Sequence, residues 1–146
     1  MEPEGVVHVL RNMVEAVRPG GLVLDLQVIR PNPRAEAGGV LVCEFDGEPL
    51  FVQADAATAA VDELVAGRRL AEEAVDDHDV LQHYASGPDL LDDWAEKERR
   101  PIGDGAARLG ATREPCVVRE RCRLRRLRLL SGDGSPDADR VHPGRG

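Results

Sequence analysis

The amino-acid sequence predicts an α/β fold, and three neighbouring features carry that prediction. Apolar residues recur at helical spacing over residues 4–17, the Gly20-Gly21 pair ends that helix, and an almost entirely apolar segment, 22–29, follows at once. A strand that is apolar at nearly every position is typical of a strand covered on both faces. We therefore expect a helix–strand unit of a mixed, mostly parallel sheet.

The composition of the chain is that of a globular protein without a membrane segment. Of its 146 residues, 42% are hydrophobic and 32% are charged. No apolar run approaches the length that spans a bilayer, and the acidic start of the sequence is unlike a secretory or transit signal. We predict a cytoplasmic protein with one domain over residues 1–130 and a disordered tail over 131–146, where apolar patterning ends.

The middle of the chain predicts a hairpin followed by a helix. Asp46-Gly47 lies between two alternating apolar runs, and this dipeptide favours a tight β-hairpin turn. We expect the hairpin strands at 40–45 and 48–53. Apolar residues at helical spacing then predict a helix over 56–66.

The second half of the chain predicts a strand, two helices and a long last strand. Weak alternation indicates a strand at about 70–82, and a capping-box signature begins a helix over 88–99. A short helix is expected near 106–109. In the last strand, 116–130, the apolar positions shift by one residue, which predicts a β-bulge near Arg125-Arg126.

The three cysteines, Cys43, Cys116 and Cys122, predict buried and unreactive thiols. Their odd number and wide spacing fit a reducing compartment. Cys116 and Cys122 would share one face of a strand about 20 Å apart, because each strand residue rises about 3.3 Å. That distance fits neither a disulfide nor a shared zinc ion.

The segment 18–24, Arg-Pro-Gly-Gly-Leu-Val-Leu, resembles a feature of one protein family. In class I S-adenosylmethionine-dependent methyltransferases, a helix typically ends in a Pro-Gly-Gly turn that runs directly into the fifth strand. The resemblance extends over residues 4–130 and covers the C-terminal half of that fold. It implies a partial Rossmann-like sheet in which an antiparallel last strand lies between 22–29 and 70–82, with the hairpin at 40–53 as an insertion.

The same resemblance implies that the cofactor-binding elements belong before residue 4. There the family has a first strand, a glycine-rich loop and an acidic residue that closes the second strand. Gly20-Gly21 is no substitute, because it follows a helix and enters a strand. No cofactor-binding residue of the family maps onto this sequence. We therefore expect a chain without S-adenosylmethionine or catalysis of its own, acting as an interaction or structural protein.

A second interpretation makes the chain the substrate-side half of a methyltransferase. Its N-terminal half would then lie upstream of this sequence and would bind S-adenosylmethionine. Under either interpretation, strand 22–29 lacks the neighbour that the family places beside it, so an apolar edge is exposed. This predicts a homodimer or a partner chain that covers the edge of strand 22–29.

Arg30, Asp77 and His78 are the candidate substrate-binding residues. Arg30 follows the first predicted strand at its carboxyl end, where α/β sheets bind ligands. Asp77 and His78 belong to the run 76–79, Asp-Asp-His-Asp, which with His83 is the densest group of potential metal ligands or general bases. Successive residues of a strand point to opposite faces, which divides this set. We expect a solvated edge there and no metal.

The arginine run Arg119–Arg128 is open to two interpretations. Six arginines within ten residues would suit a nucleic-acid backbone, which is a further alternative function. The net charge of −8 and an aromatic content of 3% argue against it, because little is present to stack on bases. The last strand would instead lie beside the acidic strand 70–82, and we expect cross-strand ion pairs between them.

Overall fold

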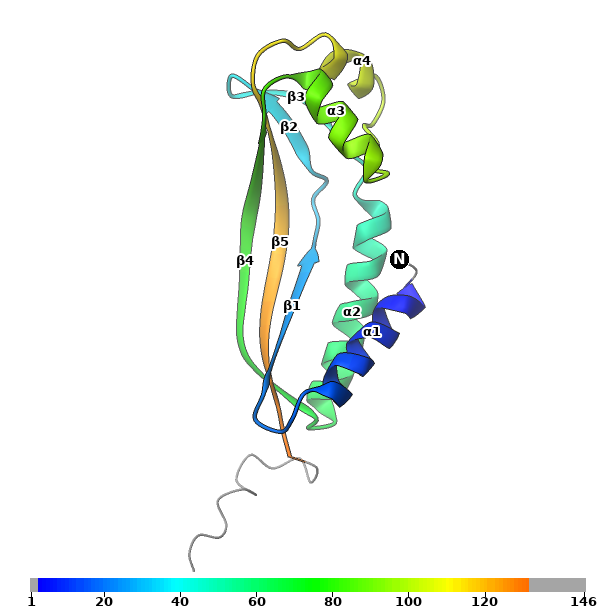
Figure 1. Cartoon of the computed structure of the whole chain (residues 1–146), viewed down its shortest axis with the longest axis vertical. Helices are drawn as coiled ribbons and strands as arrows, with labels where there is room; N and C mark the ends of the chain where they lie inside the picture. The colour runs from blue at the N-terminus through cyan, green and yellow to red at the C-terminus, as the bar shows by residue number, and fades with distance from the viewer. Residues whose placement is uncertain (1–2, 132–146) are drawn as a thin grey trace, which may run out of the picture. The chain divides into compact units, whose positions relative to one another are not determined.

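The computed structural model describes residues 3–131 (Figure 1). Within them the protein is α/β, with four helices and an open, mostly antiparallel sheet of five strands. The elements are α1 (Pro3–Ala16), β1 (Leu22–Val28), β2 (Arg34–Ala37), β3 (Val40–Glu44), α2 (Glu48–Ala66), β4 (Leu70–Tyr84), α3 (Gly87–Glu96), α4 (Gly105–Gly110) and β5 (Cys116–Leu129). The tail predicted over 131–146 lies outside the described residues, Ser131 excepted.

The last strand is the centre of the sheet. The strand order is β1-β5-β2-β3, and β4 also pairs with β5. β2 runs antiparallel to β3 and to β5. β1 also runs antiparallel to β5. Leu129 N donates to Gly21 O at one end of β1, and Ile29 N donates to Arg121 O at the other end. The antiparallel last strand between β1 and β4 is therefore confirmed, whereas the expectation of a mostly parallel sheet is wrong.

The contacts of the chain divide it into two compact units. Among the described residues, the first unit holds 3–27, Val52–Asp76 and 123–131, and the second holds Val28–Phe51 and Asp77–Cys122. Each unit has its own buried core. The first core comprises Leu10, Val14, Val23, Val61, Leu70, Leu127 and Leu129. The second comprises Ala35, Cys43, Phe45, Leu90, Trp94, Leu109, Cys116 and Val118.

The predicted hairpin at Asp46-Gly47 is wrong, because this dipeptide directly precedes helix α2. Asp46 Oδ1 accepts a hydrogen bond from Glu48 N (3.0 Å), so the aspartate caps the helix, and residues 48–53 form its first turns. The hairpin present in the structure joins β2 to β3 through Gly38-Gly39. Both glycines have positive φ, 59° and 79°, which suits a tight two-residue turn.

Most other predicted elements are confirmed. The helix 4–17 corresponds to α1, the strand 70–82 to β4, the helix 88–99 to α3 and the strand 116–130 to β5. The short predicted helix near 106–109 is α4. The shift in the alternation of β5 is present at Arg123-Leu124, two residues before the predicted place.

Strand β1 is not covered on both faces, contrary to the prediction. Val23 and Asp25 are buried beneath the helices, at 1% and 8% exposure. Leu22, Leu24 and Leu26 lie on the opposite face and are 42%, 58% and 57% exposed. The strand has apolar residues on both faces, but helices cover only one of them (Figure 1).

Candidate functional site

The backbone of β1 leaves one of its two edges without a strand. Leu129 N donates to Gly21 O (2.9 Å), so residue 21 faces β5. Backbone groups alternate between edges along a strand, and Val23 and Asp25 therefore face β5 as well. Leu22, Leu24 and Leu26 direct their N–H and C=O groups to the other edge. Within residues 3–131, the sheet order gives β1 no neighbour on that edge.

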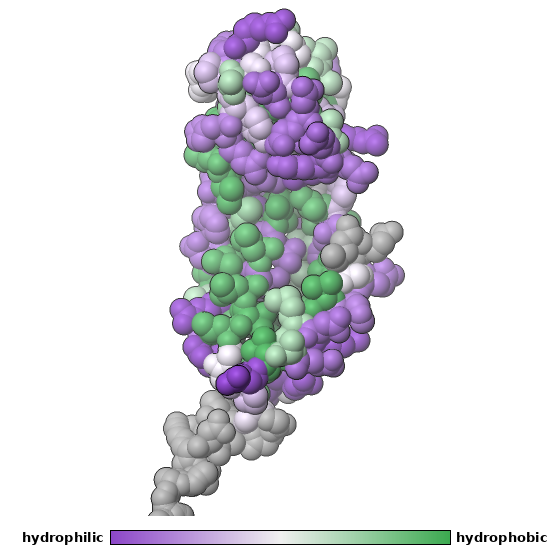
Figure 2. Space-filling model, viewed as in Figure 1, coloured by the Kyte–Doolittle hydropathy of each residue, from purple (hydrophilic) through white to green (hydrophobic). Residues whose placement is uncertain are grey.

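An apolar groove runs along this edge between β1 and α1. Its volume is about 260 Å³. It is lined by Val6, Val9, Leu10, Met13, Leu24, Asp25, Leu26, Gln27 and Ala57. On the α1 side, Val9 and Met13 are 42% and 40% exposed. In Figure 2 apolar side chains form a band over β1 and the adjoining side of α1. We call this surface, the edge of β1 together with the groove, the β1 edge site.

One polar pair interrupts the apolar lining of the β1 edge site. Gln27 Nε2 donates to Asp25 Oδ1 over 2.8 Å. Asp25 is a buried carboxylate, and the amide of Gln27 is its neighbour two residues along the same strand. A carboxylate removed from water needs hydrogen-bond donors or a cation, and the amide of Gln27 is one such donor.

The glycine turn that leads into β1 is bound to the fold by its backbone. Gly20 has a φ of 85° and donates its N–H to Leu129 O (2.8 Å), while Gly21 N donates to Arg18 O (2.9 Å). A Cβ on Gly21 would lie 2.5 Å from Cγ1 of Val17. These glycines are therefore required by the turn itself. Because both N–H groups are bonded within the fold, neither is free to bind a phosphate group.

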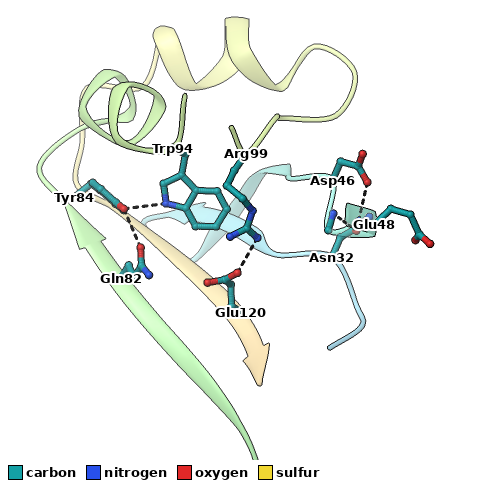
Figure 3. Close-up of polar contacts among 9 residues, drawn as sticks. Asn32, Asp46, Glu48, Gln82, Tyr84, Trp94, Arg99 and Glu120 are labelled. Carbon is teal, nitrogen blue, oxygen red and sulfur yellow. Dashed lines mark hydrogen bonds and ion pairs between the residues drawn. The ribbon is translucent and has the colours of Figure 1, made fainter. Parts of the chain in front are cut away.

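Arg30 contacts the start of α2. Its guanidinium lies 5.0 Å from the centre of the Phe51 ring and 3.6 Å from a carboxylate oxygen of Glu48. The side chains of Arg30 and Glu48 are both more than half exposed, so this ion pair contributes little to stability. Asn32 Oδ1 accepts a hydrogen bond from Gly47 N (2.9 Å) nearby, which holds the loop before α2 (Figure 3). Arg30 remains a proposed substrate contact.

Asp77 and His78 lie on β4, and the ion pair and ring contact of Arg30 are with α2 instead. Asp77 is exposed and His78 is partly buried. In the described part of the chain, no three side chains of His, Cys, Asp or Glu are grouped so that they could hold a metal ion. Arg30 thus follows β1 and contacts α2, whereas Asp77 and His78 belong to β4.

The arginines of β5 pair with the acidic residues of β4, as predicted. Asp79 accepts hydrogen bonds from Arg121 (3.1 Å) and Arg119 (3.2 Å), and these bonds lower the pKa of Asp79. Arg128 binds Glu73 through two nitrogens, at 2.5 and 3.2 Å, and lowers the pKa of that carboxyl group. Arg125 and Arg126 pair in the same way with Glu72 and Glu73, and we call all of these pairs the β4–β5 ladder.

Arg125 is the buried member of the ladder. It is 7% exposed, and its side chain lies on the helix-covered face. Its Nε donates to Glu72 (2.7 Å) and its Nη2 donates to Asp62 of α2 (3.1 Å). A nucleic-acid backbone would have to replace carboxylates that already bind these guanidinium groups.

A polar network around Trp94 belongs to the second unit (Figure 3). Trp94 Nε1 donates to the Tyr84 hydroxyl (2.9 Å), which in turn donates to Asp93 (2.5 Å). Burial and the hydrogen bond to Asp93 raise the pKa of Tyr84 to about 12. Arg99 stacks on Trp94 at 4.3 Å and pairs with Glu120 at 2.8 Å. Trp94 itself is a core residue, at 1% exposure.

The three cysteines are buried, as predicted, at 7%, 3% and 4% exposure for Cys43, Cys116 and Cys122. Burial raises the pKa of all three thiols, that of Cys43 to about 11. A thiol with a raised pKa stays protonated at neutral pH and is a poor nucleophile. The cysteines therefore act as core residues.

Comparison of this chain with protein-family models, curated proteins and solved structures finds no match. Within residues 3–131, no helix has both the length and the apolar character needed to cross a membrane. The candidate site with the most consistent geometry is the β1 edge site, which sequence analysis placed at strand 22–29 but did not connect to α1. The sequence feature that indicates this connection is the width of the apolar face of α1. That face includes Val9 and Met13 in addition to the buried Leu10 and Val14.

Proposed function

We propose that this chain is an association module whose β1 edge site binds an extended strand of a partner chain. The observation that carries the proposal is the alternation along β1. The same residues, Leu22, Leu24 and Leu26, expose apolar side chains and direct their backbone hydrogen-bonding groups outward. Strand addition uses both features at once, backbone bonds for affinity and side chains for specificity.

The exposed leucines provide a driving force for this association. Full burial of a leucine contributes about 1.5–3 kcal/mol, and these three are about half exposed, so each contributes roughly 1 kcal/mol when a partner covers it. Val9 and Met13 of α1 add apolar area on the adjoining side of the groove. An edge strand whose exposed face is apolar and uncharged is otherwise an aggregation site.

Strand binding can be tested with a synthetic peptide and two matched variants. The probe is a fluorescent peptide of 7 residues, the length of β1, made of valine and isoleucine with a central arginine and soluble ethylene-glycol ends. Leu24→Asp places a charge on the edge and should weaken peptide binding by about tenfold or more. Val75→Asp is the control, since Val75 is 48% exposed on β4 of the same unit.

Fluorescence polarisation should then show binding to the wild type and to Val75→Asp, and little binding to Leu24→Asp. Equal binding to the two variants would contradict the proposal. So would a failure of the peptide to bind the wild-type chain at all.

A second proposal concerns the sheet to which the partner strand would be added. Two features support a methyltransferase-like, Rossmann-like half sheet: the turn Arg18-Pro19-Gly20-Gly21 before β1, and an antiparallel β5 between β1 and β4. In that case the partner strand would belong to a half that binds S-adenosylmethionine, and the completed protein would be a methyltransferase. Isothermal titration of S-adenosylmethionine into this chain alone should give no heat of binding. Saturable binding by the chain alone would contradict this division of roles.

A further inference from the structure

The inference that follows rests on the proposed function, because it concerns which strand the β1 edge site binds. An incoming strand has two faces, and the site is apolar toward both. One face of the incoming strand would contact Val6, Val9 and Met13 of α1. Its other face would lie beside the exposed leucines of β1. The partner strand must therefore be apolar on both faces, as a central strand of a covered sheet is.

Asp25 adds a charge requirement to this apolar one. Asp25 lines the groove and is 8% exposed, and its carboxylate receives a hydrogen bond from Gln27. A strand added along the edge would remove the remaining water from this carboxylate. Unless the strand supplies a donor, the desolvated charge opposes binding. A cationic side chain gives the strongest hydrogen bond to a carboxylate.

A second copy of this chain does not meet these requirements. Its own β1 would present Asp25 and Gln27 on the face that lies under α1, where the groove offers Val9 and Met13. If the β1 strands of two copies paired antiparallel with Leu24 at the centre, Val23 of each copy would lie opposite Asp25 of the other. If Asp25 were at the centre, the two Asp25 carboxylates would lie opposite each other. Both arrangements bury carboxylates without a cation.

We propose that the β1 edge site selects an extended partner segment that is apolar on both faces and carries one basic side chain, which pairs with Asp25. The partner segment thus differs in sequence from β1. It has a basic residue, and not an acidic one, at the position that faces Asp25. The apolar contacts give the affinity, and the carboxylate selects among apolar strands by charge.

Three peptides of identical length and apolar composition test the charge requirement. They differ only at the central residue, which is arginine, norleucine or glutamate. The wild-type chain should bind the arginine peptide about tenfold or more tightly than the glutamate peptide, with the norleucine peptide between them. In Asp25→Asn, which keeps the shape but removes the charge, the ratio should fall to about threefold or less.

The possible results separate this inference from the proposed function. Equal binding of all three peptides to the wild type would overturn the charge requirement and leave strand addition intact. A dimer in light scattering that no peptide dissociates would show that a second copy occupies the edge, and it would overturn the inference. Absence of binding by any peptide, with a monomer in light scattering, would overturn both. The comparison among peptides uses the wild-type chain, so it does not depend on the folding of Asp25→Asn.

Discussion

Strands β1 and β4 both pair with β5, yet the two strands have opposite chemistry. β1 exposes three leucines and has no charged side chain on its open face. β4 is acidic over most of its length, with Glu72, Glu73 and the run 76–79. Charged side chains on an edge strand oppose the addition of another strand. One side of the sheet is thus protected against association, and the other is open to it.

The charges of β4 are also part of the fold. Glu73 and Asp79 bind arginines of β5, so the residues that discourage a foreign strand hold β4 to its neighbour. β1 instead is held to β5 through backbone bonds and through Val23 beneath the helices. Whether an edge strand accepts a further strand thus depends on what its side chains already bind. Where they bind nothing within the sheet, as on the leucine face of β1, a partner can be added.

Proline substitutions in β1 should produce the largest contrast, because they depend on which edge each N–H faces. Val23→Pro removes a bond to β5 and a buried side chain, and should lower the free energy of unfolding by about 2 kcal/mol or more. Leu24→Pro removes an N–H that faces outward, so the loss should be smaller, while peptide binding is lost. Urea denaturation and fluorescence polarisation measure the two effects. Equal destabilisation by both prolines would contradict the assignment of edges.

Replacement of the buried arginine of the ladder should give the next largest effect. Arg125→Met leaves Glu72 and Asp62 without their guanidinium group and should lower the free energy of unfolding by about 1–3 kcal/mol. Arg126→Met is the matched control, since the Arg126 side chain is 50% exposed and should cost less than about 0.5 kcal/mol. Thermal or urea unfolding of the two variants provides the measurement. If Arg126→Met lowered the free energy of unfolding more than Arg125→Met, burial of the arginine would not determine how much its ion pairs stabilise the fold.

Acid should weaken β4 while leaving the leucines of β1 unaffected. The pKa values of Asp79 and Glu73 are lowered in the folded protein, from ordinary values of 3.8 and 4.5, because arginines bind the charged forms. A lowered folded pKa contributes stability above the ordinary pKa that is lost as pH falls through the folded value. The urea midpoint should therefore fall between pH 7 and pH 3 by more in the wild type than in a variant with Asp79→Asn and Glu73→Gln. An identical fall in both proteins would mean that the ladder has no part in the pH dependence.

Several elements could be predicted because local and long-range requirements agree in them. The cross-strand ion pairs between β4 and β5 follow from two opposite charge runs in strands that lie side by side. The helix 4–17 and the strand 116–130 have strong periodicity of their own. Asp46-Gly47 was misleading because aspartate serves both in hairpin turns and as a helix cap, and the choice depended on Gly38-Gly39, which had already provided the turn for β3.

The candidate site was predicted only in part, for a reason that concerns burial. An apolar run such as 22–29 shows that a strand can be covered on two faces, but not whether anything covers it. Its free edge was expected on the basis of the family resemblance, whereas the groove with α1 and the buried position of Asp25 depend on tertiary packing. Position after strand 22–29 favours Arg30, and the density of potential ligands in the run 76–79 favours Asp77 and His78. Neither signal shows tertiary contacts such as those of Arg30 with Glu48 and Phe51 of α2.

Amide hydrogen exchange along β1, followed by NMR in the free chain and with the arginine peptide, is the most direct test. If the edge is open, the N–H groups of Leu22, Leu24 and Leu26 exchange fast in the free chain, those of Val23 and Asp25 exchange slowly, and the peptide slows the leucine amides. Leucine amides as slow as that of Val23 in the free monomer would contradict the account. So would a peptide that protects β4 instead.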